Sequence, residues 1–355
     1  MADELFLSVV VPVYKIPEDL LRACLASLAA QPGNDLEFIV IDDGSPDRCG
    51  TICDEVAATD ERFSVLHTPN QGVAVARNTG IDHARGSHVL FVDGDDQLPE
   101  GTVACLRSRR TELGDITCCE AHFQTENGGH DIVLPPNLSQ ATPSEIALSV
   151  VRQDMGGGPV SGTQYTWGSI WGKVFDREFL DDDLRFPVGV RKAQDRVFML
   201  EALAKEPRLA FLRHVTYVYV RNGSSICQAF NPQMAAIERQ SVNALRGAIL
   251  GCYSGHLRVE LLNALPVFGC LAFIEVLTNE TFSPQNPARL AERHANFLAL
   301  CRSYSWAFQG AVGQTIQLVT YDLLRPCLER RLYNAAFAVA QAIFLRRQAL
   351  ESAKY

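Results

Sequence analysis

Apolar runs and stretches of helical periodicity alternate along the first half of the chain. Leu7–Val13 and His88–Val92 are continuous apolar runs rich in β-branched residues, as in strands buried on both faces. Pro17–Ala30 instead repeats its apolar residues at the spacing of a helix. The same alternation predicts strands at Glu37–Ile41 and Ser64–His67, and helices at Cys49–Ala58 and Val73–Ala84. Strand–helix repetition implies right-handed crossovers, and therefore an α/β fold whose mainly parallel sheet is flanked by helices.

The pattern changes after a further strand predicted at Asp115–Phe123. Gly128–Pro143 and Asp154–Thr163 are rich in loop-forming residues. A helix is predicted at Asp195–Ala204 and an apolar strand at Leu209–Val220. From about Asn231 onward the periodicity is helical, so we expect a sheet-containing part followed by a helical C-terminal region.

Composition and charge narrow the class of protein. The chain has 355 residues, 47% hydrophobic and 21% charged, which indicates an ordered globular protein with a sizeable core. Its formal net charge is −9, whereas a nucleic-acid-binding protein normally carries a basic face. We therefore expect no nucleic-acid partner.

The eleven cysteines predict a reducing compartment rather than a set of disulfides. The chain is too long to need disulfide staples, and no signal peptide is recognisable at its start. Cys49 and Cys53, and the adjacent Cys118 and Cys119, lack the spacing of a zinc site. We expect buried thiols and a cytoplasmic protein.

Membrane association has weaker support in the sequence. No segment reaches the roughly 18 apolar residues of a spanning helix. Leu261–Ile274 and Leu332–Leu345 lack charges but are short, and we interpret both as buried helices. Arginines flank the second segment, which allows peripheral contact with the inner face of the cell membrane through the C-terminal helices.

Acidic residues follow two of the predicted strands. Asp42-Asp43-Gly44-Ser45 comes after one and Asp93-Gly94-Asp95-Asp96 after another. Ligands of open α/β sheets bind at the carboxyl ends of the strands, and paired carboxylates suit Mg²⁺ or Mn²⁺. The alternative for each cluster is a polar turn that caps the next helix.

A third polar element, Asn70–Gly80, opens the helix predicted at Val73–Ala84. Gly72 permits an unusual backbone before the helix, and the small Ala74 and Ala76 let it pack closely. Arg77 adds a cation at the same sheet edge, either for a ligand or for a buried structural salt bridge.

Taken in order, these motifs resemble glycosyltransferase family 2. The series comprises Val11-Pro12-Val13-Tyr14, Asp42-Asp43-Gly44-Ser45, Asn70-x-Gly72 with Ala76-Arg77-Asn78-x-Gly80, and Phe91-x-Asp93-x-Asp95-Asp96. The resemblance extends over at least residues 7–226 and implies the GT-A fold. A dinucleotide-binding fold lacks support because no Gly-x-Gly-x-x-Gly follows the first strand.

The resemblance implies a nucleotide-binding role for several residues. Pro12 and Tyr14 would line the nucleobase pocket, Asp42 and Asp43 would bind the base and ribose, and Arg77 would lie near the diphosphate. The base is usually uracil in this family, but the Asn that commonly follows the tyrosine is Lys15 here.

The resemblance also implies a divalent cation. Asp95 would hold Mn²⁺ or Mg²⁺ against the diphosphate, and Asp93 would contact the ribose or water bound to the metal.

On the acceptor side, the resemblance implies that Asp195 is the general base. Many members carry Glu-Asp at this point, where this chain has Gln194-Asp195, and the alternative for Asp195 is a helix cap. Trp171, Asp96 and Arg221 would lie on the acceptor or donor-sugar side, Arg221 toward the diphosphate. Trp167 and Trp171 are candidates for stacking on a sugar or, equally, for core positions.

The implied enzyme is an inverting, metal-dependent hexosyltransferase. It would move a sugar from a nucleotide-sugar, usually a UDP-sugar, to a glycan or lipid-linked acceptor in surface polysaccharide biosynthesis. Residues 1–115 would bind the nucleotide-sugar, residues 116–228 the acceptor, and residues 229–355 would form the helical C-terminal region.

Three alternatives stay open at the level of sequence. A glycosidase also needs two carboxylates but no nucleotide pocket. A nucleotidyltransferase would need a Gly-rich loop near the N-terminus. A catalytically degenerate member, acting as a nucleotide-binding or scaffolding subunit, is compatible with Gln194.

Overall fold

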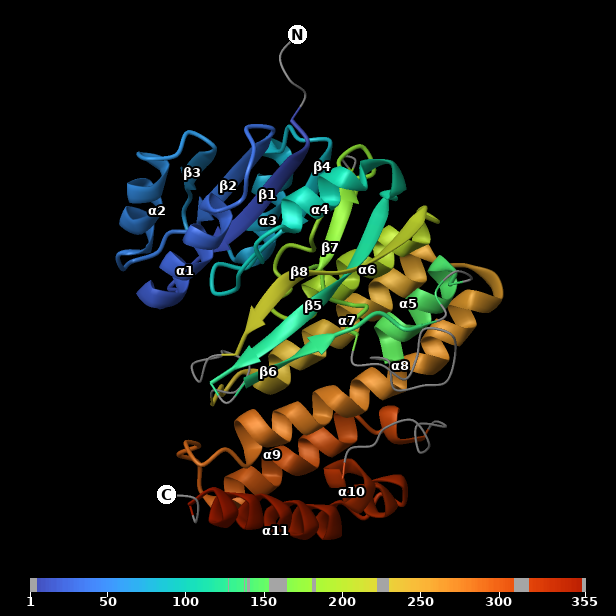
Figure 1. Ribbon diagram of the computed structural model, residues 1–355. Helices are drawn as coiled ribbons and strands as arrows, with labels where there is room; N and C mark the ends of the chain where they lie inside the picture. Colours follow the sequence, from blue (N-terminus) through green and yellow to red (C-terminus); the bar gives the residue numbers. More distant parts are fainter. Residues whose placement is uncertain are drawn as a thin grey trace.

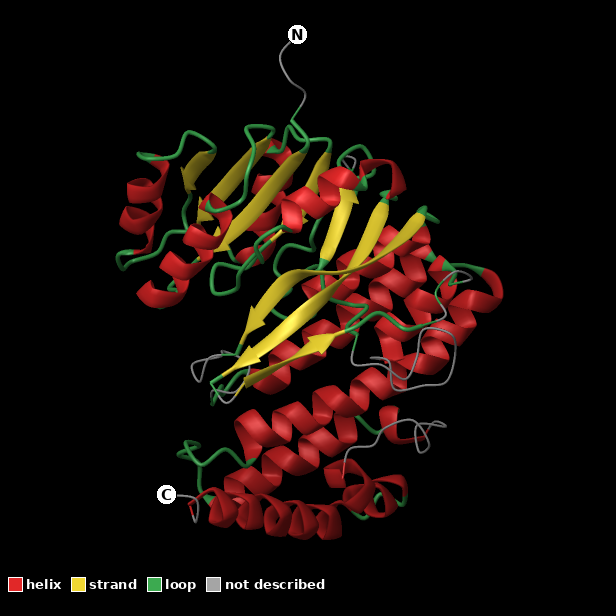
Figure 2. Cartoon of the chain, in the orientation of Figure 1, coloured by secondary structure: helices red, strands yellow, loops and turns green. Residues whose placement is uncertain are grey.

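The computed structural model describes residues 5–126, 128–136, 138, 141–152, 165–180, 183–221, 230–309 and 319–352. The loop predicted at Asp154–Thr163 lies outside these residues, as does the segment 222–226 that belongs to the family resemblance. The described strands form one mixed sheet with helices packed against it, followed by a helical region (Figures 1 and 2).

The predicted α/β architecture is confirmed. Strands β1 to β4 are parallel, in the order β3-β2-β1-β4. Their bounds are β1 Leu7–Val13, β2 Leu36–Asp42, β3 Phe63–His67 and β4 His88–Phe91. The helices between them are α1 Glu18–Ala29, α2 Cys49–Ala57 and α3 Val73–His83. Every residue of β1 and β2 is buried, as their unbroken apolar runs predict.

Helix α3 packs unusually close to the sheet. A Cβ on Gly80 would collide with Val10 Cγ1, so only glycine fits there. Ala74 and Ala76 are buried along the same helix, as predicted from their size. Gly72, just before the helix, has φ +93, and a Cβ added there would meet no atom within 4 Å. The positive φ at this position, rather than lack of space, therefore explains why residue 72 is glycine.

The sheet continues into the second part of the chain and becomes mixed. Strand β7 (Lys173–Asp176) pairs antiparallel with both β4 and β5 (Ile116–Thr125). Strand β8 (Leu209–Val220) runs parallel to β5. Residues 7–220 thus share one sheet across the predicted boundary near residue 115. Helices α4 (Thr102–Ser108) and α6 (Gln194–Ala204) complete this part, with a short 3₁₀ turn at Arg110–Glu112.

One strand departs from the loop-rich interpretation of Gly128–Pro143, and a helix follows it in residues to which the sequence assigned no element. Gly128–Ile132 forms strand β6, antiparallel to β5, although most of it is exposed. Backbone pairing with β5 creates this strand, so its own sequence carries no strand pattern. Helix α5 (Pro143–Arg152) follows, and a capping box opens it: the Glu145 carboxylate accepts from Thr142 N at 2.9 Å, and Thr142 Oγ1 accepts from Glu145 N at 3.3 Å.

The helical C-terminal region is confirmed, with Figure 1 showing α9 to α11 gathered below the sheet. Its α-helices are α7 Met234–Cys252, α8 Gly255–Val276, α9 Leu290–Ser303, α10 Val319–Glu329 and α11 Tyr333–Ser352. Short turns at Leu277–Thr281 (π) and Ala307–Gln309 (3₁₀) connect them. On α11, Phe337 and Phe344 are buried, and Phe344 stacks on Phe282 at 5.1 Å. The Leu332–Leu345 segment therefore packs against neighbouring helices along one face.

The prediction that no segment is long enough to span a membrane is wrong for one helix. Gly255–Thr281 meets the criteria of length and apolar composition, because α8 runs through Pro266. Within the most apolar 18-residue stretch of this segment, 61% is buried inside the protein, where the helix packs against α5 and α7 among other elements. The core helix of a protein outside the membrane can be equally long and apolar, so α8 is weak evidence for a membrane-spanning segment.

The described cysteines are free thiols, most of them buried. Burial raises the pKa of Cys53 and Cys119 to about 12. These thiols stay protonated at neutral pH and behave as small hydrophobic side chains, as predicted.

Candidate active site

The Asp93–Asp96 segment forms a tight turn directly after β4. Asp96 N donates to Asp93 O at 2.9 Å and closes the turn. A Cβ on Gly94 would lie 3.1 Å from Pro12 O, so glycine lets the turn approach the end of β1. The predicted acidic and nucleobase motifs therefore meet at one edge of the sheet, as expected for the carboxyl ends of adjacent parallel strands.

Arg77 joins this turn to the predicted base. Its Nη2 donates to Asp93 Oδ1 and its Nη1 to Asp195 Oδ1, both at 2.7 Å. The guanidinium side chain is 5% exposed and lies over the Phe186 ring at 5.4 Å. Burial disfavours its charge, but Asp195 and Asp93 outweigh that effect and raise the pKa of Arg77. Two carboxylates from distant parts of the chain thus share one cation.

Asp195 lies in the first turn of α6. Ala193, two residues before Asp195, has φ +62, a backbone conformation that is uncommon outside glycine. Burial raises the pKa of the Asp195 carboxyl, while the Arg77 charge opposes the rise. Lys192 pairs with Glu238 of α7 at 2.6 Å and with Glu275 of α8. The helical region therefore helps to fix where α6 begins.

Asp195 borders a pocket of about 730 Å³. Trp171, Phe123 and Tyr219 form an aromatic wall, with Tyr219 stacked on Phe123 at 5.4 Å. Arg191 lies on the same pocket. An aromatic wall beside a carboxylate can hold a sugar ring against a base.

The sequence left open whether Trp167 and Trp171 belong to the core or to the site, and the structure gives them different places. Trp167 is fully buried and belongs to the core. Trp171 lines the pocket and stacks on Tyr217 at 5.4 Å.

Asp96 faces the protein interior, which does not fit the predicted contact with a sugar. It is 2% exposed, Tyr217 Oη donates to its Oδ2 at 2.5 Å, and Val220 N donates to its Oδ1 at 2.7 Å. Burial, with Asp93 and Asp95 nearby, raises the pKa of Asp96 to about 8. Because both oxygens are engaged inside the protein, Asp96 ties the acidic turn to β8.

Asp42 and Asp43 are also largely buried and bonded within the chain. Asp42 accepts from Ser45 N at 3.0 Å and contacts His67 Nδ1 at 2.9 Å. The Asp43 carboxylate accepts from Gln71 N and from Gly72 N, each at 2.8 Å. These contacts hold the loop after β2 to the loop before α3, so the two aspartates build the edge on which a nucleotide would lie.

The other predicted nucleotide residues lie at the end of β1 and beyond β8. Pro12 is buried within β1, whereas Tyr14 is 39% exposed. Lys15 has φ +52, and its Nζ lies 5.3 Å from the centre of the Tyr14 ring. Asparagine tolerates this left-handed backbone well, which explains why this position suits it. Arg221 lines a separate hollow of about 410 Å³ that Pro17 and Gln124 also border.

Two further residues hold the site, and sequence reasoning missed the first of them. Tyr217 contacts Asp96 and accepts a hydrogen bond from Asp93 N at 3.3 Å. Lys173 is fully buried, and its Nζ donates to Thr166 O at 3.1 Å. The alternating pattern of β8 could have marked Tyr217 as inward-facing, but its partners lie in the distant turn after β4.

Comparison with known proteins agrees with the geometry. The family described as "Glycosyl transferase family 2" matches residues 8–131. The glycosyltransferase EpsJ of Bacillus subtilis (strain 168) is 30% identical over 232 residues, which cover 64% of this chain and 64% of EpsJ. Poly(ribitol-phosphate) beta-glucosyltransferase of Bacillus spizizenii is 29% identical over 64% of this chain and 34% of that protein. The matched part thus spans less than two thirds of these relatives.

Among solved structures, S. aureus TarS 1-349 superposes with a TM-score of 0.60 at 20% identity, covering 97% of this chain and 92% of that one. This likeness establishes the fold and extends it through the helical region. The family match, the relatives and the fold agree with the motif order along the sheet edge. Residues 8–131 therefore match glycosyltransferase family 2, and the chain as a whole has the GT-A fold.

Proposed function

We propose that this protein is an inverting glycosyltransferase that takes a sugar from a nucleotide-sugar donor. The observation that carries the proposal is the Arg77 bridge, which holds the acidic turn and Asp195 at the same pocket. The donor would bind across residues 1–115 and the acceptor across residues 116–228.

A UDP-sugar is the proposed donor. The TarS fold neighbour is known in complex with UDP-GlcNAc, and a second neighbour, a mannosyltransferase of Pyrobaculum calidifontis, in complex with GDP-Man and Mn²⁺. In this proposal Pro12, Tyr14, Asp42 and Asp43 would form the edge against which the base and ribose bind.

The donor atoms at the acidic turn fit Mn²⁺ or Mg²⁺. Asp93 and Asp95 offer carboxylate oxygens and are partly exposed. Among the residues that the structure describes, no three His, Cys, Asp or Glu side chains gather into a cation cage. Such ions are often bound by one or two carboxylates together with substrate phosphates. When bound, the ion would stabilise negative charge on the departing diphosphate.

Asp195 is the proposed base. An acceptor hydroxyl in the pocket would lose its proton to Asp195 as its oxygen attacks the anomeric carbon, and the nucleoside diphosphate would leave from the opposite face. The glycosidic bond forms as the bond to the diphosphate breaks, and the configuration inverts. Arg77 and Asp96 are positioning residues in this proposal: Arg77 orients Asp93 and Asp195, and Asp96 anchors the acidic turn. Trp171 would contact the acceptor, and Arg221 the donor diphosphate.

The acceptor is proposed to be a glycan or lipid-linked sugar of a surface polysaccharide, handled at the cytoplasmic side of the membrane. The name of one relative, a poly(ribitol-phosphate) beta-glucosyltransferase, supports an acceptor of this general kind. The free cysteines support a reducing compartment.

The test is nucleotide release from a panel of UDP- and GDP-sugars with Mn²⁺, followed by mass spectrometry of products from a lipid-linked acceptor mixture. We expect one donor to be turned over, and EDTA or Asp95→Ala to abolish turnover. Tight nucleotide binding without turnover of any donor would instead support a degenerate binding subunit. Sugar release that EDTA leaves unchanged would support a glycosidase.

A further inference from the structure

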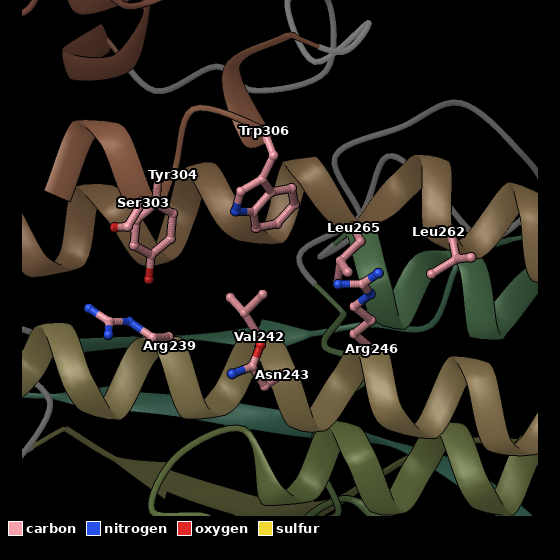
Figure 3. Close-up of a pocket in the computed structure, with 9 residues that line it drawn as sticks. All are labelled: Arg239, Val242, Asn243, Arg246, Leu262, Leu265, Ser303, Tyr304 and Trp306. Atoms are coloured by element: carbon pink, nitrogen blue, oxygen red, sulfur yellow. The ribbon is translucent and has the colours of Figure 1, made fainter. Parts of the chain in front are cut away.

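One face of α7 lines a cavity away from the catalytic acids. Arg239, Val242, Asn243 and Arg246 follow the i, i+3, i+4, i+7 spacing that places residues on one side of a helix. They border a cavity of about 490 Å³, with Trp306 on its other side (Figure 3). Leu262 and Leu265 of α8, together with Ser303 and Tyr304, form the rest of the wall. The cavity therefore combines two cations with an apolar and aromatic lining.

The indole ring of Trp306 lines this cavity with one face packed against α8. A Cβ on Gly269 would lie 2.7 Å from Trp306 Cη2, so the ring lies directly against the backbone of α8. The side chain is nevertheless 40% exposed. An aromatic face that is fixed on one side and open on the other suits the apolar face of a sugar ring.

Tyr304 adds a buried polar atom that lacks a partner. The residue is 3% exposed, and within the described part of the chain its hydroxyl has no hydrogen-bond partner. Figure 3 shows this hydroxyl pointing into the space between α7 and α8, on the side of Arg239. A buried hydroxyl without a partner is costly, and a polar ligand group would remove that cost.

Arg239 and Arg246 are exposed and, among the described residues, make no hydrogen bond or ion pair with their guanidinium groups. By contrast, the exposed Arg22 contacts both Glu18 and Glu55 at 3.0 Å. In a chain of net charge −9, unneutralised arginines on a cavity favour an anionic ligand, since guanidinium binds carboxylate and phosphate in a bidentate manner.

The cavity and the candidate active site are linked by a chain of hollows that share lining residues. Arg191 borders both the pocket of Asp195 and a hollow of about 490 Å³ beside α7. That hollow in turn shares Arg239 and Asn243 with the cavity of Trp306. Arg239 and Arg246 are about 10 Å apart along the helix axis, from a rise of about 1.5 Å per residue. An elongated ligand would meet one arginine after another on leaving the active site.

We propose that this groove, from Arg191 to Trp306, binds the distal part of an anionic acceptor glycan. Carboxylates or phosphodiesters of the chain would contact Arg239 and Arg246, and a sugar ring would stack on Trp306. The proposal rests on the proposed function, because it names the class of acceptor that the glycosyltransferase elongates or decorates.

Binding in the absence of nucleotide tests the groove by itself. Isothermal titration calorimetry would compare a galacturonate hexamer and a glycerol-phosphate hexamer with uncharged maltohexaose. We expect at least one anionic hexamer to bind, and Arg239→Ala/Arg246→Ala to weaken it by about tenfold or more, the effect of losing a charge-assisted contact. The matched control is Arg289→Ala/Arg302→Ala, which removes the same charge from exposed positions of the same helical region outside the cavity lining.

A second variant separates sugar recognition from plain anion binding. Trp306→Leu should weaken the anionic hexamer, while affinity for inorganic phosphate stays as in the wild type. The proposal is overturned if maltohexaose binds as tightly as both anionic hexamers, or if the two arginine variants behave alike. Binding only to inorganic phosphate, or only to vesicles containing phosphatidylglycerol, also overturns it.

Turnover measurements keep the two proposals apart. With the true donor, groove variants should release nucleotide to water at the wild-type rate but show a raised KM for a long anionic acceptor. If the wild type releases nucleotide from no donor, the proposed function fails, and the calorimetric result still decides the groove. Normal donor turnover with an unchanged KM for the acceptor in Arg239→Ala/Arg246→Ala would contradict the groove proposal and leave the proposed function standing.

Discussion

The sheet edge and the helical region use arginine in opposite ways. Arg77 is enclosed between Asp93 and Asp195, with 5% of its side chain exposed. Arg239 and Arg246 lie exposed on a cavity, without an ion pair among the described residues. An enclosed cation fixes the geometry of the groups around it, whereas an unpaired one remains available to a ligand. The comparison therefore separates residues that build a site from residues that are free to recognise a partner.

The largest expected effect comes from the base. Asp195→Asn should lower kcat by about 10²- to 10⁴-fold, the usual contribution of a general base, because the amide cannot accept the acceptor's proton. Steady-state nucleotide release with donor and acceptor measures this loss. Nucleotide affinity should change little, since the residue lies on the acceptor side. Undiminished kcat in Asp195→Asn would assign Asp195 a purely structural role.

Removal of the enclosed cation should affect stability next. Arg77→Ala leaves Asp93 and Asp195 without their shared partner, and we expect the free energy of unfolding to fall by about 3 kcal/mol, the low end for a broken buried pair. Urea denaturation at neutral pH measures it.

Arg22→Ala is the matched control for Arg77→Ala, because Arg22 also bridges two carboxylates but is 42% exposed. Exposed pairs contribute about 0–1 kcal/mol, so this variant should cost less. Equal losses in the two variants would contradict the contrast between an enclosed and an exposed bridge.

The pH dependence of turnover should follow Asp195. Burial raises the pKa of its carboxyl, and a base works only when deprotonated. The acid limb of the kcat/KM profile should therefore lie at higher pH than an ordinary aspartate would give. In Asp195→Glu the limb should move, since the longer side chain changes both burial and the Arg77 contact. A limb that stays in place would mean that another group controls it.

At Asp96 the expected effect is a dependence of stability on pH. Its pKa is raised to about 8, so the folded state binds a proton that the unfolded state releases above the ordinary range near 4. Stability should therefore decrease as pH rises between these values, by at most about 1.4 kcal/mol per pH unit. Asp96→Asn, which mimics the protonated acid, should flatten that slope in urea denaturation. An unchanged slope would show that Asp96 is not the titrating group.

The parallel half of the fold was predictable because each element carries its own signal. The unbroken apolar run of β1 matches the structure residue for residue, and the acidic turn follows β4 as its motif predicts. Strand β6 had no such signal, since four of its five residues are exposed and pairing with β5 creates it. Helix α5 does carry local signals that the prediction overlooked, because the Thr142–Glu145 capping box is followed by buried apolar residues at helical spacing, from Ile146 to Val151.

In the candidate site, too, the sequence predicted the residues but not their contacts. Residue identity and motif order pointed to Asp93, Arg77 and Asp195, but only the structure shows one guanidinium bonded to both carboxylates. Asp96 illustrates the limit most clearly. Its motif placed it among the ligand-facing acids, whereas the inward Tyr217 hydroxyl and the backbone of Val220 hold it inside.

The sequence by itself determined the α/β fold, the resemblance to glycosyltransferase family 2 and the identity of the acids at the sheet edge. These properties depend on local periodicity and on short motifs, which chain neighbours specify. Tertiary structure decided which acids face the pocket, how far α8 extends through Pro266, and that two arginines of α7 line one cavity. Those features depend on contacts between residues far apart in the chain, because burial, ion pairing and cavity shape arise only when the elements pack.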